Sequence, residues 1–173
     1  GTSKGKAWKS FAKVNALRFA PGDKIVIAPG VHAETLMPLA QGSAAAPVVI
    51  QFLPGVHEFA VEQAHRRPLF VSNSCDAPTE PKPIGVLIER SRHLRLQGGG
   101  VEGAGKTTLL MGGRMVEILN SQAEDIAYSG LVFDLKRPTV SECRVVEAKE
   151  NETTVQVAEG STYEIKDGKF AWT

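Results

Sequence analysis

The 173-residue chain lacks the features of a membrane protein, of a disulfide-rich protein and of a strongly charged one. No apolar run reaches the length of a membrane span. The formal net charge is +1, so the overall balance gives no sign of a nucleic-acid or membrane partner. The two cysteines, Cys75 and Cys143, form no disulfide framework, and we expect free or buried thiols. These absences leave an ordinary soluble globular chain of one domain, or of one and part of a second.

The sequence also has little that indicates a metal site or a nucleophilic enzyme. Its four histidines are His32, His57, His65 and His93. They have no metal-ligand spacing, and none belongs to a zinc-protease motif. No serine or cysteine lies in a nucleophile-elbow pattern. We therefore expect no metal and no cofactor, and surface or structural roles for the histidines.

Helical patterning is confined to the N-terminal residues. Apolar residues recur with helical spacing over residues 4–20, and Pro21-Gly22 ends the predicted helix. Residues 23–27 and 48–52 are short apolar runs bounded by Pro-Gly pairs, and they predict strands of a parallel sheet. Strands recur about every ten residues after residue 20, which is typical of a sandwich, a barrel or a β-helix. The expected fold class is all-β.

Later segments predict a loop and two hairpins. Three prolines within residues 72–83 argue against a helix or a central strand there. Residues 143–157 read as two β-rich runs around a polar turn, and residues 163–172 as a second hairpin around Asp167-Gly168.

One phrase of the sequence occurs twice. The first copy is Ile88–Gly98 and the second copy is Ile118–Gly130. Each has an aliphatic residue, a polar turn at Ser91 or Ser121, two alternating apolar positions and a glycine. Repetition of strand, turn and strand at a fixed spacing is typical of stacked solenoid coils. It favours a parallel β-helix, with the N-terminal helix covering the open end of the first coil.

Between the copies lies a phosphate-loop pattern, G-x-x-x-x-G-K-[ST]. Its defining residues are Gly100, Gly105, Lys106 and Thr107. A working phosphate loop joins a buried strand to a helix. Here the preceding run alternates polar and apolar residues, and two glycines, Gly112 and Gly113, fall where the helix would run. We interpret the pattern as a glycine-rich turn between coils, with nucleotide binding as a less favoured alternative.

The densest polar group follows the predicted strand 131–133. It contains Asp134, Arg137 and Glu142, which we take as candidate substrate-binding residues. Asp134 could position a sugar hydroxyl or act as an acid or base, and Arg137 could form a bidentate pair with a carboxylate. The alternative is purely structural, with Asp134 and Arg137 paired to each other.

The stretch from Leu94 to Trp172 resembles the N-terminal part of the exo-acting α-1,3-galactosidases of glycoside hydrolase family 110. The matching residues are Leu96, Gly98, Gly100, Gly113-Arg114-Met115, Ser121, Ile126, Phe133-Asp134, Arg137-Pro138, Ser141-Glu142, Tyr163–Ile165 and Asp167–Trp172. The resemblance implies a right-handed parallel β-helix over residues 1–140 and the start of an antiparallel β insertion, a hairpin or barrel, over residues 141–173.

The resemblance also implies an activity. Family members hydrolyse terminal α-1,3-linked galactose with inversion and without a metal, so the expected partner is a carbohydrate rather than nucleic acid or a membrane. The catalytic carboxylates are expected in coils beyond Thr173, so we expect no catalytic residue in this chain, which would be an inactive fragment of a longer enzyme. The expected location is periplasmic, outer-surface or secreted in a bacterium, and a homo-oligomer is left open. The alternative is a noncatalytic carbohydrate-binding or structural β-solenoid.

Overall fold

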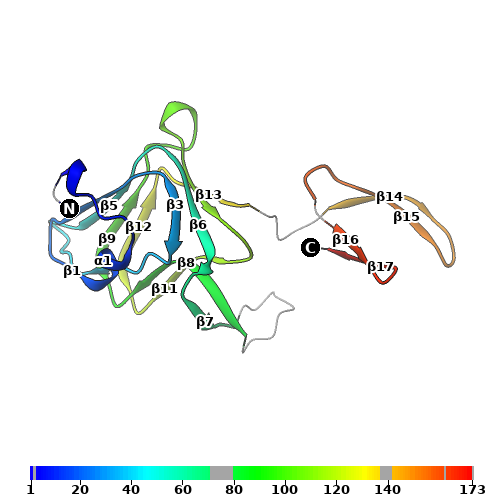
Figure 1. Ribbon diagram of the computed structural model, residues 1–173, viewed down its shortest axis with the longest axis horizontal. Coiled ribbons are helices and arrows are strands. Elements are labelled where there is room, and N and C mark those ends of the chain that lie inside the picture. The colour runs from blue at the N-terminus through cyan, green and yellow to red at the C-terminus, as the bar shows by residue number, and fades with distance from the viewer. Residues whose placement is uncertain (2, 71–79, 137–141, 162, 173) are drawn as a thin grey trace. The chain divides into compact units, whose positions relative to one another are not determined.

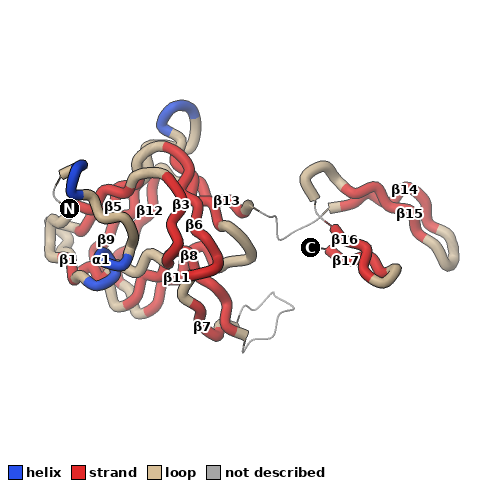
Figure 2. The backbone as a smooth tube through the Cα atoms, in the orientation of Figure 1, coloured by secondary structure: helices blue, strands red, loops and turns tan. Residues whose placement is uncertain are grey.

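The computed structural model describes Gly1 and residues 3–70, 80–136, 142–161 and 163–172 (Figure 1). The chain divides into two compact units, Gly1–Asp134 and Leu135–Thr173, and each is described by itself. The boundary predicted at residues 140/141 falls outside the described residues. Strands predominate throughout, and helical turns are few and short (Figure 2). The all-β prediction is confirmed.

The first unit begins with a 3-10 turn, η1 (Lys4–Lys6), and a short helix, α1 (Ala12–Ala16). Its strands are β1 (Arg18–Phe19), β2 (Lys24–Ile27), β3 (Gly30–Glu34), β4 (Leu39–Ala40), β5 (Val48–Phe52), β6 (Gly55–Gln63), β7 (Arg66–Pro68), β8 (Pro81–Glu89), β9 (Arg92–Gln97), β10 (Thr107–Met111), β11 (Val116–Ser121), β12 (Glu124–Ser129) and β13 (Val132–Leu135). A second 3-10 turn, η2 (Gly103–Gly105), precedes β10.

The chain passes through three sheets in turn. Their orders are β12-β9-β5-β2, β13-β10-β6-β3 and β11-β8-β7. The pairs β2–β5, β5–β9, β9–β12, β3–β6, β6–β10 and β8–β11 are all parallel. Successive strands β8, β9 and β10 enter three different sheets, and β11, β12 and β13 then enter the same three in the same order. The two strands predicted at residues 23–27 and 48–52 are present as β2 and β5 and pair in parallel.

The core lies between the sheets and is aliphatic. Along β5, Val48, Ile50 and Phe52 are fully buried and alternate with half-buried residues, as a strand with one inward face requires. Leu94 and Leu96 of β9 lie in register with Val48 and Ile50 and are also fully buried. Each such side chain contributes about 1.5–3 kcal/mol relative to an exposed position.

The predicted N-terminal helix is much shorter than expected. Only Ala12–Ala16 are α-helical, the N-cap Phe11 has no side-chain cap, and Leu17 is already extended. Arg18 and Phe19 leave the helical pattern because they pair with β4. A helix of this length depends on packing rather than propensity, and Phe11 and Val14 supply that packing because both are buried.

The loop predicted over residues 72–83 is corrected at its end, because β8 begins at Pro81. Prolines are tolerated there because this end of β8 pairs antiparallel with the edge strand β7, Pro83 opposite Arg66 and Pro81 opposite Pro68. Residues 71–79, which contain Cys75, lie outside the described residues.

The two copies of the repeated phrase do stack, but in a register that the sequence comparison missed. Ser121 lies opposite Glu89 and Ile126 opposite Leu94, so the position equivalent to Ser91 is Ala123. The turns correspond at Arg90 and Gln122, which both have φ of 50°. The two serines are therefore not equivalent.

The glycine that ends each copy is required by the close approach of the two backbones. A Cβ on Gly98 would overlap the carbonyl oxygen of Gly130, and a Cβ on Gly130 would lie 2.8 Å from that of Gly98. Gly130 also has φ of 63°. The glycine at the end of each copy therefore marks a position where the two backbones stack closely.

The second unit consists of two antiparallel hairpins, as predicted. Strand β14 (Cys143–Ala148) pairs with β15 (Thr153–Val157), and β16 (Tyr163–Lys166) pairs with β17 (Lys169–Trp172). Asp167 and Gly168 both have positive φ, as a type I′ hairpin turn requires. Cys143 is exposed and carries a free thiol.

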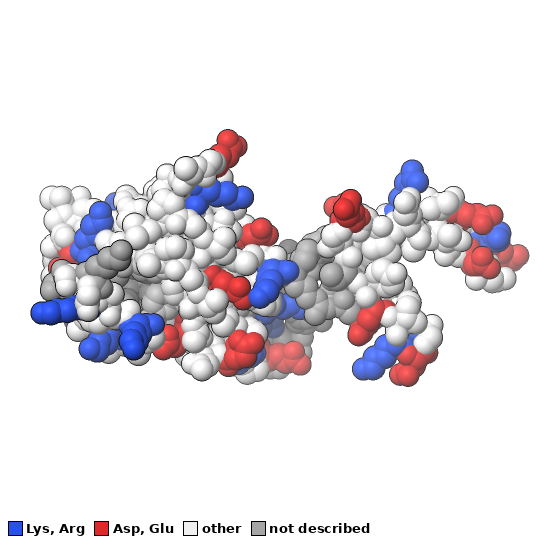
Figure 3. Space-filling model, turned by 45° about the horizontal axis from the view of Figure 1, so that its top comes forward, with Lys and Arg blue, Asp and Glu red and all other residues white. Residues whose placement is uncertain are grey.

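The surface has no large field of one charge sign on the face drawn in Figure 3, where Lys and Arg side chains lie among Asp and Glu. Among the described residues, no helix is long and apolar enough to cross a membrane.

Candidate functional site

The predicted substrate-binding residues are divided between the two compact units and the part of the chain outside the described residues. Asp134 is exposed on β13 in the first unit. Glu142 is exposed in the second unit, where its backbone N–H donates to Ser161 Oγ at 3.0 Å. Arg137 lies outside the described residues. The grouping of these three side chains stays a prediction.

The phosphate-loop pattern has a geometry unlike that of a phosphate loop. Residues Thr107–Met111 after it form strand β10 rather than a helix. Thr107 is buried; its Oγ1 accepts from the Gly99 N–H at 2.9 Å and donates to the Gly105 carbonyl at 3.1 Å. Without a following helix, no helix N-terminus holds a phosphate here. The threonine instead closes a turn before β10.

A charged cluster joins the two copies on the outer face of the β9–β12 pair. Asp125 Oδ2 lies 2.7 Å from His93 Nδ1 and 2.7 Å from Arg95 Nη2. Arg95 Nη1 also donates to the Asp125 carbonyl at 2.7 Å. His93 and Asp125 both have positive φ, near 50°. The arrangement places one carboxylate between two nitrogen donors from the neighbouring strand β9.

The electrostatics of this cluster limit its chemistry. Hydrogen bonds from Arg95 and then His93 lower the pKa of Asp125 to about 2. Asp125 therefore stays anionic near neutral pH. It can accept hydrogen bonds, but it is not suited to be a general acid, which needs a raised pKa.

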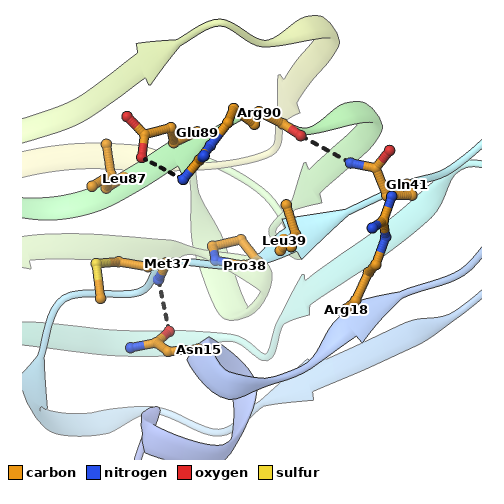
Figure 4. Close-up of a pocket in the computed structure, with 9 residues that line it drawn as sticks. All are labelled: Asn15, Arg18, Met37, Pro38, Leu39, Gln41, Leu87, Glu89 and Arg90. Atoms are coloured by element: carbon orange, nitrogen blue, oxygen red, sulfur yellow. Dashed lines mark hydrogen bonds and ion pairs between the residues drawn. The ribbon is translucent and has the colours of Figure 1, made fainter.

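A concave pocket opens on the first unit beside the turn of the first copy (Figure 4). Its volume is about 570 Å³. Its charged and amide lining residues are Asn15, Arg18, Gln41, Glu89 and Arg90. These residues come from α1, β1, the end of β4, the end of β8 and the following turn, so the pocket exists only once those segments stack.

The negative charge of the Glu89 carboxylate at this pocket is already balanced by neighbouring arginines. Its Oε1 accepts from Arg67 Nη1 at 2.9 Å, and its Oε2 lies 3.6 Å from Arg90 Nη2. The hydrogen bond from Arg67 is the main reason why the pKa of Glu89 is lowered. Glu89 is anionic near neutral pH and, like Asp125, is not suited to be a general acid.

A pair of histidines lies on β3 and β6, with His57 buried and His32 half-buried against Phe11 of the N-terminal segment. His57 Nε2 is 2.8 Å from the Leu53 carbonyl, so it carries the proton and donates; His57 Nδ1 then accepts from His32 Nε2 at 3.2 Å. Burial lowers the pKa of both, that of His32 to about 4. Phe11 stacks on His32 with ring centroids 4.6 Å apart. The pair is a neutral structural element of the core.

The described residues contain no group of three or more His, Cys, Asp or Glu side chains that could hold a metal ion. Two histidines for which the sequence predicted surface or structural roles, His32 and His57, contact each other. The contact could have been found only from the β3–β6 register, because the two residues belong to different strands.

Sequence reasoning also missed the Asp125 cluster and the pocket. The signal for the cluster was present, because the correct register of the two copies places His93 and Arg95 beside Asp125. The pocket had no local signal, since its residues are scattered between positions 15 and 90 and meet only in the folded chain.

Comparisons with known proteins identify relatives. No protein-family model matches the chain. It is 36% identical over 172 residues to alpha-1,3-galactosidase A of Akkermansia muciniphila, covering 99% of this chain and 28% of that protein. It is 29% identical over 129 residues to alpha-1,3-galactosidase A of Bacteroides thetaiotaomicron, covering 73% and 22%. It is 27% identical over 174 residues to alpha-1,3-galactosidase B of Akkermansia muciniphila, covering 99% and 20%.

The predicted resemblance is confirmed: proteins named alpha-1,3-galactosidase A and B are homologues of this chain. The chain spans less than a third of the length of each of these relatives.

Proposed function

We propose that this chain, a homologue of one part of the α-1,3-galactosidases, is the N-terminal portion of a glycoside hydrolase that removes terminal α-1,3-linked galactose. One observation carries the proposal: homology extends over 99% of the chain but only 28% of the Akkermansia relative. A relationship along the whole chain supports a shared domain rather than a shared motif.

The proposed architecture is the first coils of a right-handed parallel β-helix. The support is that β8, β9 and β10 lie in three different sheets, and that β11, β12 and β13 then enter the same sheets in the same order, with β11 and β12 parallel to β8 and β9. In a solenoid each coil contacts only its neighbours, so inward residues are fully buried only where coils lie on both sides.

The inward residues of the last strands support further coils beyond them. Ile118 and Ile126 lie in register with Val86 and Leu94, which are fully buried, yet both are only half-buried. A following coil would remove this apolar surface from water, at about 25 cal/mol per Å².

The proposed mechanism is inversion without a metal. It needs one carboxylic acid to protonate the leaving oxygen and one carboxylate to activate water, roughly 6.5–9.5 Å apart. Glu89 and Asp125 are both held anionic by neighbouring cations. Neither fits the acid role, which supports catalytic carboxylates elsewhere in the longer enzyme and an inactive chain 1–173.

Within this chain, Asp134, Arg137 and Glu142 stay the proposed contacts to substrate. Asp134 is an exposed carboxylate on β13, placed where it can accept a hydrogen bond from a sugar hydroxyl. The second candidate function, a noncatalytic carbohydrate-binding module, is favoured by the pocket at Gln41 and Glu89, which offers polar groups without a general acid.

The test is release of galactose from a terminal α-1,3-galactoside by chain 1–173 and by the longer chain encoded by the same gene. We expect the longer chain to release galactose first as the β-anomer, observed by proton NMR, and chain 1–173 to release none. If the longer chain binds the galactoside without releasing galactose, the noncatalytic module is the correct function.

A further inference from the structure

The pocket of Figure 4 has the size of a small-molecule site. Its volume of about 570 Å³ falls inside the range of roughly 300–1,000 Å³ typical of ligand pockets. Arg18 extends on the same side as Gln41, whereas Glu89 and Arg90 close another side. The walls between them are apolar and include Met37, Leu39 and Leu87.

Of the charged residues that line the pocket, Arg18 has no charged partner among the described residues. Glu89 is paired with Arg67 and lies near Arg90, so its charge is already balanced. Arg18 is exposed, and its guanidinium has no hydrogen bond or ion pair with any residue in the described part of the chain. A planar guanidinium with free donors binds a carboxylate or a sulfate through two parallel hydrogen bonds.

The amide side chains differ in what they leave free. Asn15 is fully used, because its Nδ2 donates to the Thr35 carbonyl and its Oδ1 accepts from the Met37 N–H, each at 2.8 Å. Gln41 Nε2 donates to the Arg90 carbonyl at 2.8 Å, but Gln41 Oε1 has no partner among the described residues. The amide of Gln41 is thereby held in place with an acceptor available for a hydroxyl group.

We propose that this pocket binds a saccharide unit that carries an anionic group, either a carboxylate or a sulfate. The anionic group pairs with Arg18, a sugar hydroxyl donates to Gln41 Oε1, and the C–H face of the ring lies against Leu39 and Met37. Nothing in the proposed hydrolysis of α-1,3-galactosides requires such a site, so the inference goes beyond that function.

The experiment is a binding titration of chain 1–173 by calorimetry at constant ionic strength. The four titrants are galacturonate, galactose 6-sulfate, neutral galactose and inorganic sulfate. We expect saturable binding of galacturonate, galactose 6-sulfate or both, tighter than that of galactose and of inorganic sulfate. The stronger of the two acidic sugars identifies the anionic group.

Three variants locate the binding. Arg18→Gln should weaken binding of the acidic sugar about tenfold, because a charge-assisted hydrogen bond is lost. Arg18→Lys should weaken binding of the acidic sugar less, because the charge remains although the two parallel donors of the guanidinium are lost. Arg66→Gln is the matched control, because it removes the same charge from an exposed residue of β7 that does not line the pocket, and it should leave binding unchanged.

Three results would overturn the inference: equal binding of galactose and of both acidic sugars, binding of the acidic sugars unaffected by Arg18→Gln, or no saturable binding of either. An unchanged unfolding midpoint shows that each variant is folded, which we expect because the Arg18 side chain is exposed and makes no hydrogen bond or ion pair with the described residues. The readout is binding by chain 1–173, so its failure is distinguishable from failure of galactose release.

Discussion

The two copies of the repeated phrase have the same backbone course but different surroundings. In the first copy, Ile88, Leu94 and Leu96 are fully buried. Their partners in the second copy are Asn120, which is exposed, and Ile126 and Tyr128, which are half-buried. Strand β9 of the first copy has parallel neighbours on both sides, β5 and β12, whereas β12 is the last strand of its sheet. Burial in this fold is thus decided by the number of neighbouring strands as much as by the strand's own sequence.

The largest difference between the copies should appear when an inward aliphatic side chain is truncated. Leu94→Ala removes a fully buried side chain and should lower the free energy of unfolding by about 2–5 kcal/mol. Ile126→Ala, at the paired position, should cost roughly half of that or less, because Ile126 is already partly in water. Urea denaturation of both variants measures the difference. Equal losses would contradict the contrast between the copies.

The corrected register gives the next prediction. Ser91 is buried, and its Oγ accepts from the Ala40 N–H at 3.0 Å and donates to the Pro38 carbonyl at 3.0 Å. Ser91→Ala leaves a buried N–H unpaired and should cost about 1–3 kcal/mol in urea unfolding. Ser121→Ala should cost less than about 0.5 kcal/mol, because Ser121 is not the equivalent residue. Comparable losses for the two variants would contradict the corrected register and favour the one in which Ser91 matches Ser121.

The polar pair of the second copy should contribute less. Tyr128 Oη donates to Asn120 Oδ1 at 2.7 Å, at positions that Leu96 and Ile88 occupy in the first copy. Tyr128→Phe removes this hydrogen bond and should cost about 0.5–1.5 kcal/mol, measured by urea unfolding. Asn120→Ala should give a similar loss, and the double variant should cost less than the sum of both. Strict additivity would show that the bond contributes nothing.

Lowering the pH should reduce the stability of the chain through the histidine pair on β3 and β6. His32 has a folded pKa of about 4 against an ordinary 6.5, so the unfolded chain binds more protons between these values. Stability should therefore be fully present above about pH 6.5 and fall as the pH drops toward about 4. His32→Phe should reduce this slope in urea denaturation at several pH values, whereas the exposed His65→Gln should not. A flat profile over this range would contradict the assignment of neutral, buried rings.

The ion pair that links the copies should have the smallest effect. The pKa of Asp125 is about 2 against an ordinary 3.8, so its contribution should be present above pH 3.8 and lost as the pH falls toward 2. The cluster is exposed, and surface ion pairs contribute little. NMR titration of the Asp125 carboxyl should give a midpoint near 2, and Arg95→Gln should raise it. An ordinary midpoint in the unaltered chain would show that the cluster does not form in solution.

The sequence predicted where the strands lie better than it predicted which strands pair and in what register. The strands β2 and β5 and both hairpins of the second unit were predictable, because alternation and turn residues are local signals. The register of the copies was not, since matching Ser91 to Ser121 ignores that Arg90 and Gln122 form the equivalent turns. The helix over residues 4–20 was overpredicted because the pairing of Arg18 with Leu39 overrides helical spacing.

The candidate sites differ in the same respect, because one has a local sequence signal and the other has none. A polar group such as Asp134, Arg137 and Glu142 is visible in the sequence because its members are neighbours. The pocket at Arg18 and Gln41 was invisible, because its residues meet only through stacking of β1, β4 and β8. For a fold of stacked parallel strands, local sequence indicates where the chain turns, and the register between strands decides which side chains meet.

Amide hydrogen exchange in chain 1–173 tests most directly whether the second copy is the open end of a stack that further coils complete. We predict strong protection of the amides of β9 and weaker protection of those of β12, with β12 gaining protection in the longer chain that we propose. Equal protection of β9 and β12 in chain 1–173 would contradict the account, because the second copy would then already be as stable as the first.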